Sequence, residues 1–125
     1  DMGTCITYDL ITEEGIYEGG GISPGLNMRF KSIKQNTARL PLVEINPNPQ
    51  LIGRSTVSCI QSGVFNGLVA ELNGIVSEYE SKYDRLEIIM CGGDMKYFEN
   101  TLKRPIFAAP ELVLRGLNRI LIHNA

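Results

Sequence analysis

The sequence predicts an α/β fold in which a three-stranded antiparallel meander extends into a mixed sheet with flanking helices. Alternating apolar segments open the chain over residues 1–20, a long helical pattern covers 55–83, and an apolar run at 85–91 precedes further helices. A meander followed by alternating helices and strands is typical of an α/β layer. The 125 residues suffice for one domain, 1–125, with a hydrophobic core.

The first half of the chain supplies the meander and a helix. Residues 1–8 and 9–20 alternate weakly between apolar and polar side chains, and the Thr-Glu-Glu-Gly at 12–15 predicts a turn between the second and third strands. The glycines and proline of 19–25 end the meander and begin a helix. Its helically spaced apolar positions are Leu26, Phe30 and Ile33.

A loop rich in Pro and Asn then spans 40–49, with one candidate short strand at 42–45. Apolar steps of three and four from 55 to about 83 predict the longest helix. One side of this helix carries no side chains, which favours close packing of a neighbouring helix or backbone over direct ligand approach. The positions concerned are Gly63, Gly67 and Gly74.

The last third of the chain predicts two short strands and two helices. The run at 85–91 indicates a buried strand, and a short helix passes through Tyr97 and Phe98. Residues 106–108 form a candidate last strand, and Pro110 opens a final helix with apolar residues at helical spacing.

Composition and charge exclude several classes of function. The net charge of −2 argues against electrostatic wrapping of nucleic acid. The densest basic group, Arg29 with Lys31 and Lys34, is interpreted as a solvated helix face rather than a phosphate track. No apolar run approaches the roughly 20 residues of a membrane span, and no signal peptide is recognisable. We therefore expect no nucleic-acid or membrane partner and a cytoplasmic location.

Three cysteines, Cys5, Cys59 and Cys91, are odd in number and lie within apolar runs. This usage predicts reduced core thiols rather than a disulfide framework. The single histidine, His123, lies two residues from the end, which disfavours a nucleophilic Cys/His pair. No metal-ligand spacing of Cys or His residues is present, so a structural zinc site is not expected.

The opening Asp-Met-Gly-Thr at residues 1–4 is a candidate phosphate site. Gly3 allows a close turn, while Thr4 offers a hydroxyl and a backbone N–H to phosphate oxygens. Asp1 supplies a carboxylate that can hold a cation beside the phosphates. Taken alone the pattern is weak, and a tight β-turn is the plainer interpretation.

Further glycine-containing motifs follow in a fixed order. The cluster at 19–25 precedes a helix, Gly-Arg-Ser-Thr occupies 53–56 at the mouth of the long helix, and Gly-Gly-Asp at 92–94 follows a buried strand. The opening motif at 1–4 and the last motif at 92–94 put flexible backbone and helix N-termini on one side of a sheet, where anions are favoured. The two glycines at 92–93 also let a flat adenine ring lie against the main chain, although an ordinary strand-to-helix turn explains them equally well.

Together these motifs resemble the C-terminal half of the type III pantothenate kinases, bacterial enzymes of the actin-like/sugar-kinase ATPase superfamily. The resemblance runs from residue 1 to about 124. Its most specific pieces are the motifs at 1–4, 20–26 and 53–56, supported by 92–94 and 110–118. It implies an actin-like ATPase (ribonuclease H-like) domain, the C-terminal domain of a two-domain kinase whose N-terminal domain lies outside this sequence.

The resemblance also implies an activity: ATP-dependent phosphorylation of pantothenate to 4'-phosphopantothenate, the first step of coenzyme A synthesis, by a cytoplasmic homodimer. It assigns Asp1 to a monovalent cation, K+ or NH4+, and Thr56 to a hydrogen bond with pantothenate. The residues that it assigns to ATP are Gly3, Thr4, Gly92 and Gly93, of which the two later glycines face adenosine.

The family's general base and a Mg2+-holding phosphate loop belong to upstream motifs, Gly-x-Asp-Arg and Asp-x-Gly-Asn-Thr, that this sequence lacks. We therefore assign no catalytic residue here, interpret Asp9 as a turn residue, and expect this chain alone to be inactive, because phosphoryl transfer needs several groups at once. Two alternatives stay open: a non-catalytic accessory transcription-factor homologue that binds protein, and another actin-like-fold sugar or acyl kinase.

Overall fold

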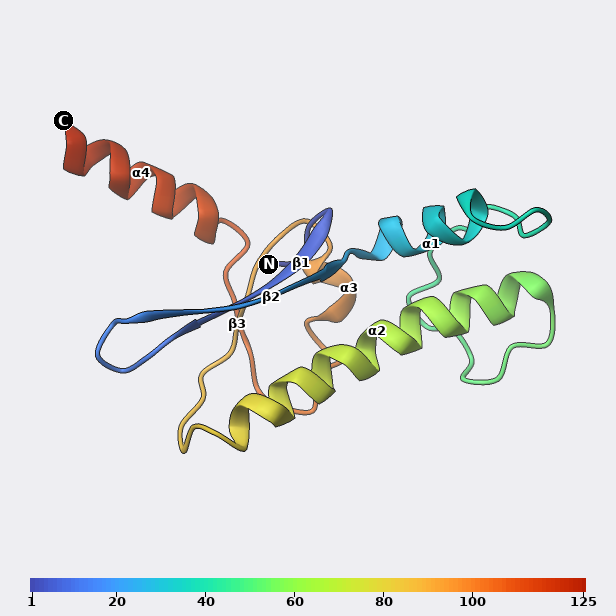
Figure 1. Cartoon of the computed structure of the whole chain (residues 1–125), viewed down its shortest axis with the longest axis horizontal. Coiled ribbons are helices and arrows are strands. Elements are labelled where there is room, and N and C mark those ends of the chain that lie inside the picture. Colours follow the sequence, from blue (N-terminus) through green and yellow to red (C-terminus); the bar gives the residue numbers. More distant parts are fainter.

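An antiparallel hairpin at the start of the chain is the longest sheet in the computed structural model, which describes residues 1–125 (Figure 1). Strand β1 (Cys5–Ile11) pairs with β2 (Tyr17–Pro24), and the register shifts between Leu10 and Ile11. The predicted turn at 12–15 joins them. Gly15, at φ 79°, adopts the left-handed conformation that a turn requires and glycine favours.

The predicted three-stranded meander is wrong in its first strand. Residues 1–4 make one isolated bridge, from Met2 to Ile6, before the chain turns back. Instead, the Met2 amide donates to the Cys91 carbonyl at 2.7 Å, and the Asp94 amide donates to the Met2 carbonyl at 2.9 Å. The opening segment is therefore held by the distant segment after β3, because those backbone groups satisfy its hydrogen bonds.

Both helices predicted in the first two thirds of the chain are confirmed. Helix α1 (Leu26–Gln35) begins after Gly25 and buries Leu26 and Phe30. Helix α2 (Thr56–Glu80) has 25 residues and ends slightly before the predicted limit. It begins with a reciprocal cap, in which the amide of Ser58 donates to Ser55 Oγ at 3.1 Å and the amide of Ser55 donates to Ser58 Oγ at 2.8 Å.

The expected mixed sheet does not form. Strand β3 (Ile89–Met90) pairs in parallel with β4 (Phe107–Ala108), and this pair is separate from the hairpin. The strand predicted at 85–91 is therefore only two residues long, because β4 pairs with Ile89 and Met90 alone. The candidate strand at 42–45 is irregular, although Val43 within it is buried. The short helix at Tyr97 and Phe98 is confirmed as α3 (Met95–Phe98).

The hydrophobic core lies along one face of α2. Phe65 of α2 stacks on Phe98 of α3 with ring centroids 4.9 Å apart, and Leu68 and Phe98 are completely buried. The opening segment, the hairpin, α1, β3, α3 and the loop between α1 and α2 supply the remaining core residues. The buried apolar set is Met2, Ile6, Leu26, Phe30, Val43, Ile60, Val64, Phe65, Leu68, Leu72, Met90, Met95 and Phe98.

The glycine side of α2 is left uncovered. A Cβ atom added at any of Gly63, Gly67 or Gly74 would meet nothing within 4 Å. The predicted close packing against these glycines is therefore not made within this chain. The cysteine prediction is also corrected: all three thiols are free, but only Cys91 is buried, and Cys59 is exposed on α2.

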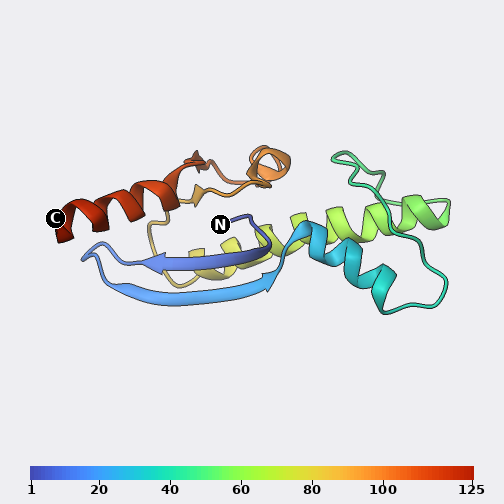
Figure 2. The ribbon, with the colours of Figure 1, turned by 90° about the horizontal axis from the view of Figure 1, so that it is seen from above.

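The predicted final helix is confirmed as α4 (Leu112–Asn124), which projects from the rest of the chain in Figure 1 and, seen from above in Figure 2, extends to the end of the molecule where the C-terminus lies. None of its residues is buried. Its exposed large apolar side chains are Leu112, Val113, Leu114, Leu117, Ile120, Leu121 and Ile122. None of the helices is long and apolar enough to span a membrane.

Candidate functional site

A polar cleft of about 660 Å³ lies where the opening turn, α1 and the segment after β3 meet. Three sequence-predicted site residues, Gly3, Thr4 and Gly93, line it. Asp94 lies on the same side as Gly93, and α1 forms a further wall with several polar side chains. Those α1 side chains are Asn27, Lys31, Ser32 and Gln35.

Backbone hydrogen bonds fix the opening turn at the cleft. The Gly3 amide donates to the Cys5 carbonyl at 3.1 Å, and the Gly25 amide donates to the Thr4 carbonyl at 3.1 Å. Gly25 is buried, and a side chain there would collide with the carbonyl oxygens of Gly3 and Thr4. The start of α1 is thereby held directly against the turn, while the Thr4 side chain stays exposed.

Gly92 brings the two predicted nucleotide motifs together. Its φ of 96° lies in the left-handed region, and a Cβ atom there would lie 2.5 Å from Asp1 Oδ1 and 2.6 Å from the Met2 amide. Only glycine allows this approach. Gly92 therefore lies behind the cleft wall, against the opening segment, whereas Gly93 lines the cleft.

Two carboxylates lie at or beside the cleft. Burial raises the pKa of Asp94, and the Lys96 ammonium opposes that rise. Asp1 is half-buried, and its carboxylate takes part in no ion pair or side-chain hydrogen bond. No group of three or more His, Cys, Asp or Glu side chains comes together as a metal-ligand cluster.

Thr56 is not brought to this cleft. It is the exposed first residue of α2, and α2 begins at the end of the molecule away from the chain's N-terminus (Figure 1). Gly53 packs against the backbone of Ser58 and Cys59, so the motif at 53–56 builds the helix start. Within a single chain, Thr56 and Thr4 therefore belong to different surfaces.

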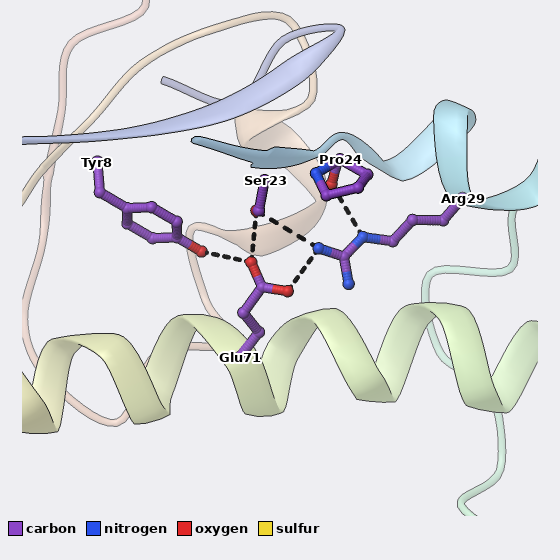
Figure 3. Close-up of polar contacts among 5 residues, drawn as sticks. All are labelled: Tyr8, Ser23, Pro24, Arg29 and Glu71. Carbon is purple, nitrogen blue, oxygen red and sulfur yellow. Dashed lines mark hydrogen bonds and ion pairs between the residues drawn. The ribbon is translucent and has the colours of Figure 1, made fainter. Parts of the chain in front are cut away.

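A polar network joins the hairpin, α1 and α2 (Figure 3). Glu71 accepts hydrogen bonds from the Tyr8 hydroxyl, at 2.8 Å, and from the Ser23 hydroxyl. The Arg29 guanidinium pairs with Glu71 and also donates from Nε to the Pro24 carbonyl at 2.9 Å. These contacts tie the end of β2 and the first turn of α1 to the middle of α2.

The electrostatics of the network follow from its hydrogen bonds. Burial alone would raise the pKa of Glu71, but donation from Ser23, Arg29 and Tyr8, together with the charge of Arg29, lowers it. Burial and the Glu71 carboxylate both raise the pKa of Tyr8. Glu71 is therefore the ionised centre of the network.

Sequence comparison places the chain in a family. A sequence profile described as Type III pantothenate kinase matches residues 1–78. The chain belongs to the type III pantothenate kinase family. Its matches include a type III pantothenate kinase of Christiangramia forsetii, 54% identical over 124 residues, which cover 99% of this chain and 51% of that protein. A type III pantothenate kinase of Cytophaga hutchinsonii is 46% identical over 124 residues, which cover 99% of this chain and 53% of that protein.

A solved structure also matches. A crystal structure from Campylobacter jejuni, described as a conserved Baf family transcriptional activator, superposes with a TM-score of 0.70 at 25% identity, covering 98% of this chain and 55% of that one. The chain thus spans about half the length of the relatives that it matches.

The sequence did not predict that α1 lines the cleft or that Glu71 is the centre of a polar network. Lys31 was interpreted as part of a solvated face, whereas it lines the cleft beside the turn of Thr4. One sequence feature could have indicated Glu71: it is the only charged residue among the first 22 residues of α2. A lone acid in such a segment calls for a cationic or donor partner.

Proposed function

We propose that this chain is the C-terminal half of a kinase that transfers the terminal phosphoryl group of ATP to the primary hydroxyl of pantothenate. The product is 4'-phosphopantothenate, the first intermediate of coenzyme A synthesis, and the reaction takes place in the cytoplasm. The observation that carries this proposal is the meeting of the segments 1–4 and 92–94 at one polar cleft. The family match supports it.

In this proposal the opening turn holds the phosphates of ATP. Gly3 lets the main chain approach the phosphate oxygens, and Thr4 adds a hydroxyl and an amide donor. Gly93 lies beside adenosine across the cleft, and Gly92 keeps the two segments in contact. Such donors stabilise charge on a transferring phosphoryl group without reorganising during the reaction.

Asp1 is proposed to hold the monovalent cation, K+ or NH4+. Its half-buried carboxylate has no cationic partner in the chain, and hard cations take oxygen ligands. A bound monovalent cation would offset phosphate charge beside Thr4. Mg2+ would accompany ATP through residues of the N-terminal half.

The N-terminal half is also proposed to supply the general base, so that the fragment 1–125 alone is inactive. We further propose that the assembled protein has an actin-like ATPase fold.

The exposed apolar residues of α4 support a two-domain protein, because so many would otherwise face water. We propose that the rest of the polypeptide covers them. Replacing Leu117 with Ser should lower the thermal midpoint of the complete protein, and Arg119→Ser should leave it unchanged; equal midpoints would contradict this packing.

Thr56 is proposed to bind pantothenate in a pocket that a second copy completes. The open face of α2 at Gly63 and Gly67 begins two turns after Thr56, and a bare helix face lets another backbone come close. A homodimer along this face would place partner residues near Thr56. Sedimentation of the complete protein tests this, since a monomer at micromolar concentration would contradict it.

The test of the kinase proposal is ATP-dependent formation of phosphopantothenate by the complete protein, measured with Mg2+ and a titration of K+. A substrate panel of sugars and acyl acceptors separates it from other kinases of similar fold. The fragment 1–125 serves as the inactive control. An intact, folded protein that forms no phosphopantothenate under these conditions would rule out the proposed reaction.

A second candidate function is a protein-binding regulatory module without catalysis. The structural match to a protein described as a Baf family transcriptional activator favours it. The net charge of −2 points to a protein partner rather than direct DNA contact. An intact Gly-x-Asp-Arg motif in the complete protein, together with kinase activity, would exclude this candidate; loss of both would favour it.

A further inference from the structure

We propose that α1 is the third wall of the nucleotide site and that Lys31 binds the phosphate chain of the nucleotide. This inference rests on the proposed function and adds a residue to its site. The motifs at 1–4 and 93–94 account for two sides of the cleft. The sequence gives no phosphate-binding role to the third side, which α1 forms.

The wall is a single row of side chains along the helix. Asn27, Lys31 and Gln35 are spaced four residues apart, so they lie on one face, and all three line the cleft. The Gly25 amide, bonded to the Thr4 carbonyl at 3.1 Å, fixes where this row begins. Lys31 lies roughly 9 Å along the axis from Gly25, since each residue rises about 1.5 Å. Because side chains on a helix lean toward its N-terminus, the long Lys31 side chain can extend back toward the opening turn.

The three basic residues of this region have different surroundings. Arg29 is engaged by Glu71 and by the Pro24 carbonyl. Lys34 is exposed and is not a lining residue of the cleft. Lys31 alone both lines the cleft and lacks an ion-pair partner.

Charge complementarity identifies the ligand group. Lys31 is the only cation among the lining residues, and Asp94 is the only anion. An ammonium group with three donors suits phosphate oxygens. The opposite wall at Gly93 and Asp94 offers flat backbone and an acceptor, which suit the base and ribose hydroxyls. The nucleotide therefore lies with its phosphates between Thr4 and Lys31.

The test is direct binding of MgATP to the complete protein, measured by calorimetry, with wild type and three variants. Lys31→Met should weaken binding about tenfold, because it removes one charge-assisted contact. Lys31→Arg should retain most of the affinity. Lys34→Met is the matched control on the same helix and should bind as wild type does. Raising the salt concentration should weaken wild-type binding more than that of Lys31→Met.

Each outcome decides the inference. Equal affinities for wild type and Lys31→Met, or equal losses in Lys31→Met and Lys34→Met, would overturn the contact while leaving the kinase proposal intact. Binding of MgATP without phosphorylation of pantothenate would refute the proposed reaction but not the contact. Absence of MgATP binding in folded wild-type protein would overturn both. Circular dichroism of each variant confirms that a loss of affinity does not reflect unfolding.

Discussion

Arg29 on α1 and Glu71 on α2 form an ion pair with only 21% and 26% of their side chains exposed, 42 residues apart in sequence. The same carboxylate accepts hydrogen bonds from the Tyr8 and Ser23 hydroxyls of the hairpin. Because α1 forms one wall of the cleft, this single carboxylate fixes that wall relative to both the hairpin and α2 (Figure 3).

Replacing Glu71 with Gln should therefore destabilise the protein. The change leaves the Arg29 guanidinium without its charge partner in a largely buried place, and the expected cost is about 1–3 kcal/mol. A lower thermal midpoint of the complete protein is the measurement. Glu80→Gln is the matched control, since it breaks the more exposed pair with Arg104 and should have a much smaller effect. Equal midpoints for the two variants would contradict a central role for Glu71.

The lowered pKa of Glu71 predicts a pH dependence with a defined sign. In the unfolded chain Glu71 takes up its proton near its ordinary pKa of 4.5, whereas in the folded protein it does so at lower pH. The unfolded state therefore binds more protons in this interval, and the stabilisation present above pH 4.5 is lost as pH falls through the folded pKa. Thermal midpoints measured from about pH 6 to about pH 3 should fall more steeply for wild type than for Glu71→Gln; parallel curves would oppose this account.

Gly92→Ala should disturb the junction of the segments 1–4 and 92–94. The left-handed φ of Gly92 and the nearby Asp1 carboxylate both resist a methyl group, and the expected destabilisation is about 1–3 kcal/mol. Gly93→Ala is the control, because a Cβ atom there meets nothing within 4 Å. Thermal unfolding should separate the two variants, and a Gly92→Ala protein as stable as Gly93→Ala would disprove the tight approach.

Asp1→Asn in the complete protein should raise the concentration of K+ needed for half-maximal activity, because the amide removes the charge proposed to hold the cation. Asp9→Asn is the comparison. Asp9 is exposed and bonds the hydroxyls of Thr7 and Tyr17 in the hairpin, so its loss should leave the K+ titration where it was. A titration curve unmoved by Asp1→Asn would remove Asp1 from the cation site.

The sequence by itself determined the helices and turns. Apolar spacing located α1, α2 and α4, and Gly15 marked the hairpin turn, because these features depend on residues only three or four positions apart. The family resemblance carried by motifs such as residues 1–4 was also readable there, and the family match confirms it.

Only the tertiary structure decided the strand partners and the composition of the cleft. Met2 pairs with Cys91 rather than extending a meander, and the Tyr8 hydroxyl meets a carboxylate 63 residues away. The sequence likewise did not indicate what the Lys31 side of α1 faces. The packing of α1 against the opening turn places that side at the cleft. Local patterns define which face of an element is apolar, whereas long-range backbone pairing and packing select the polar groups that face one another.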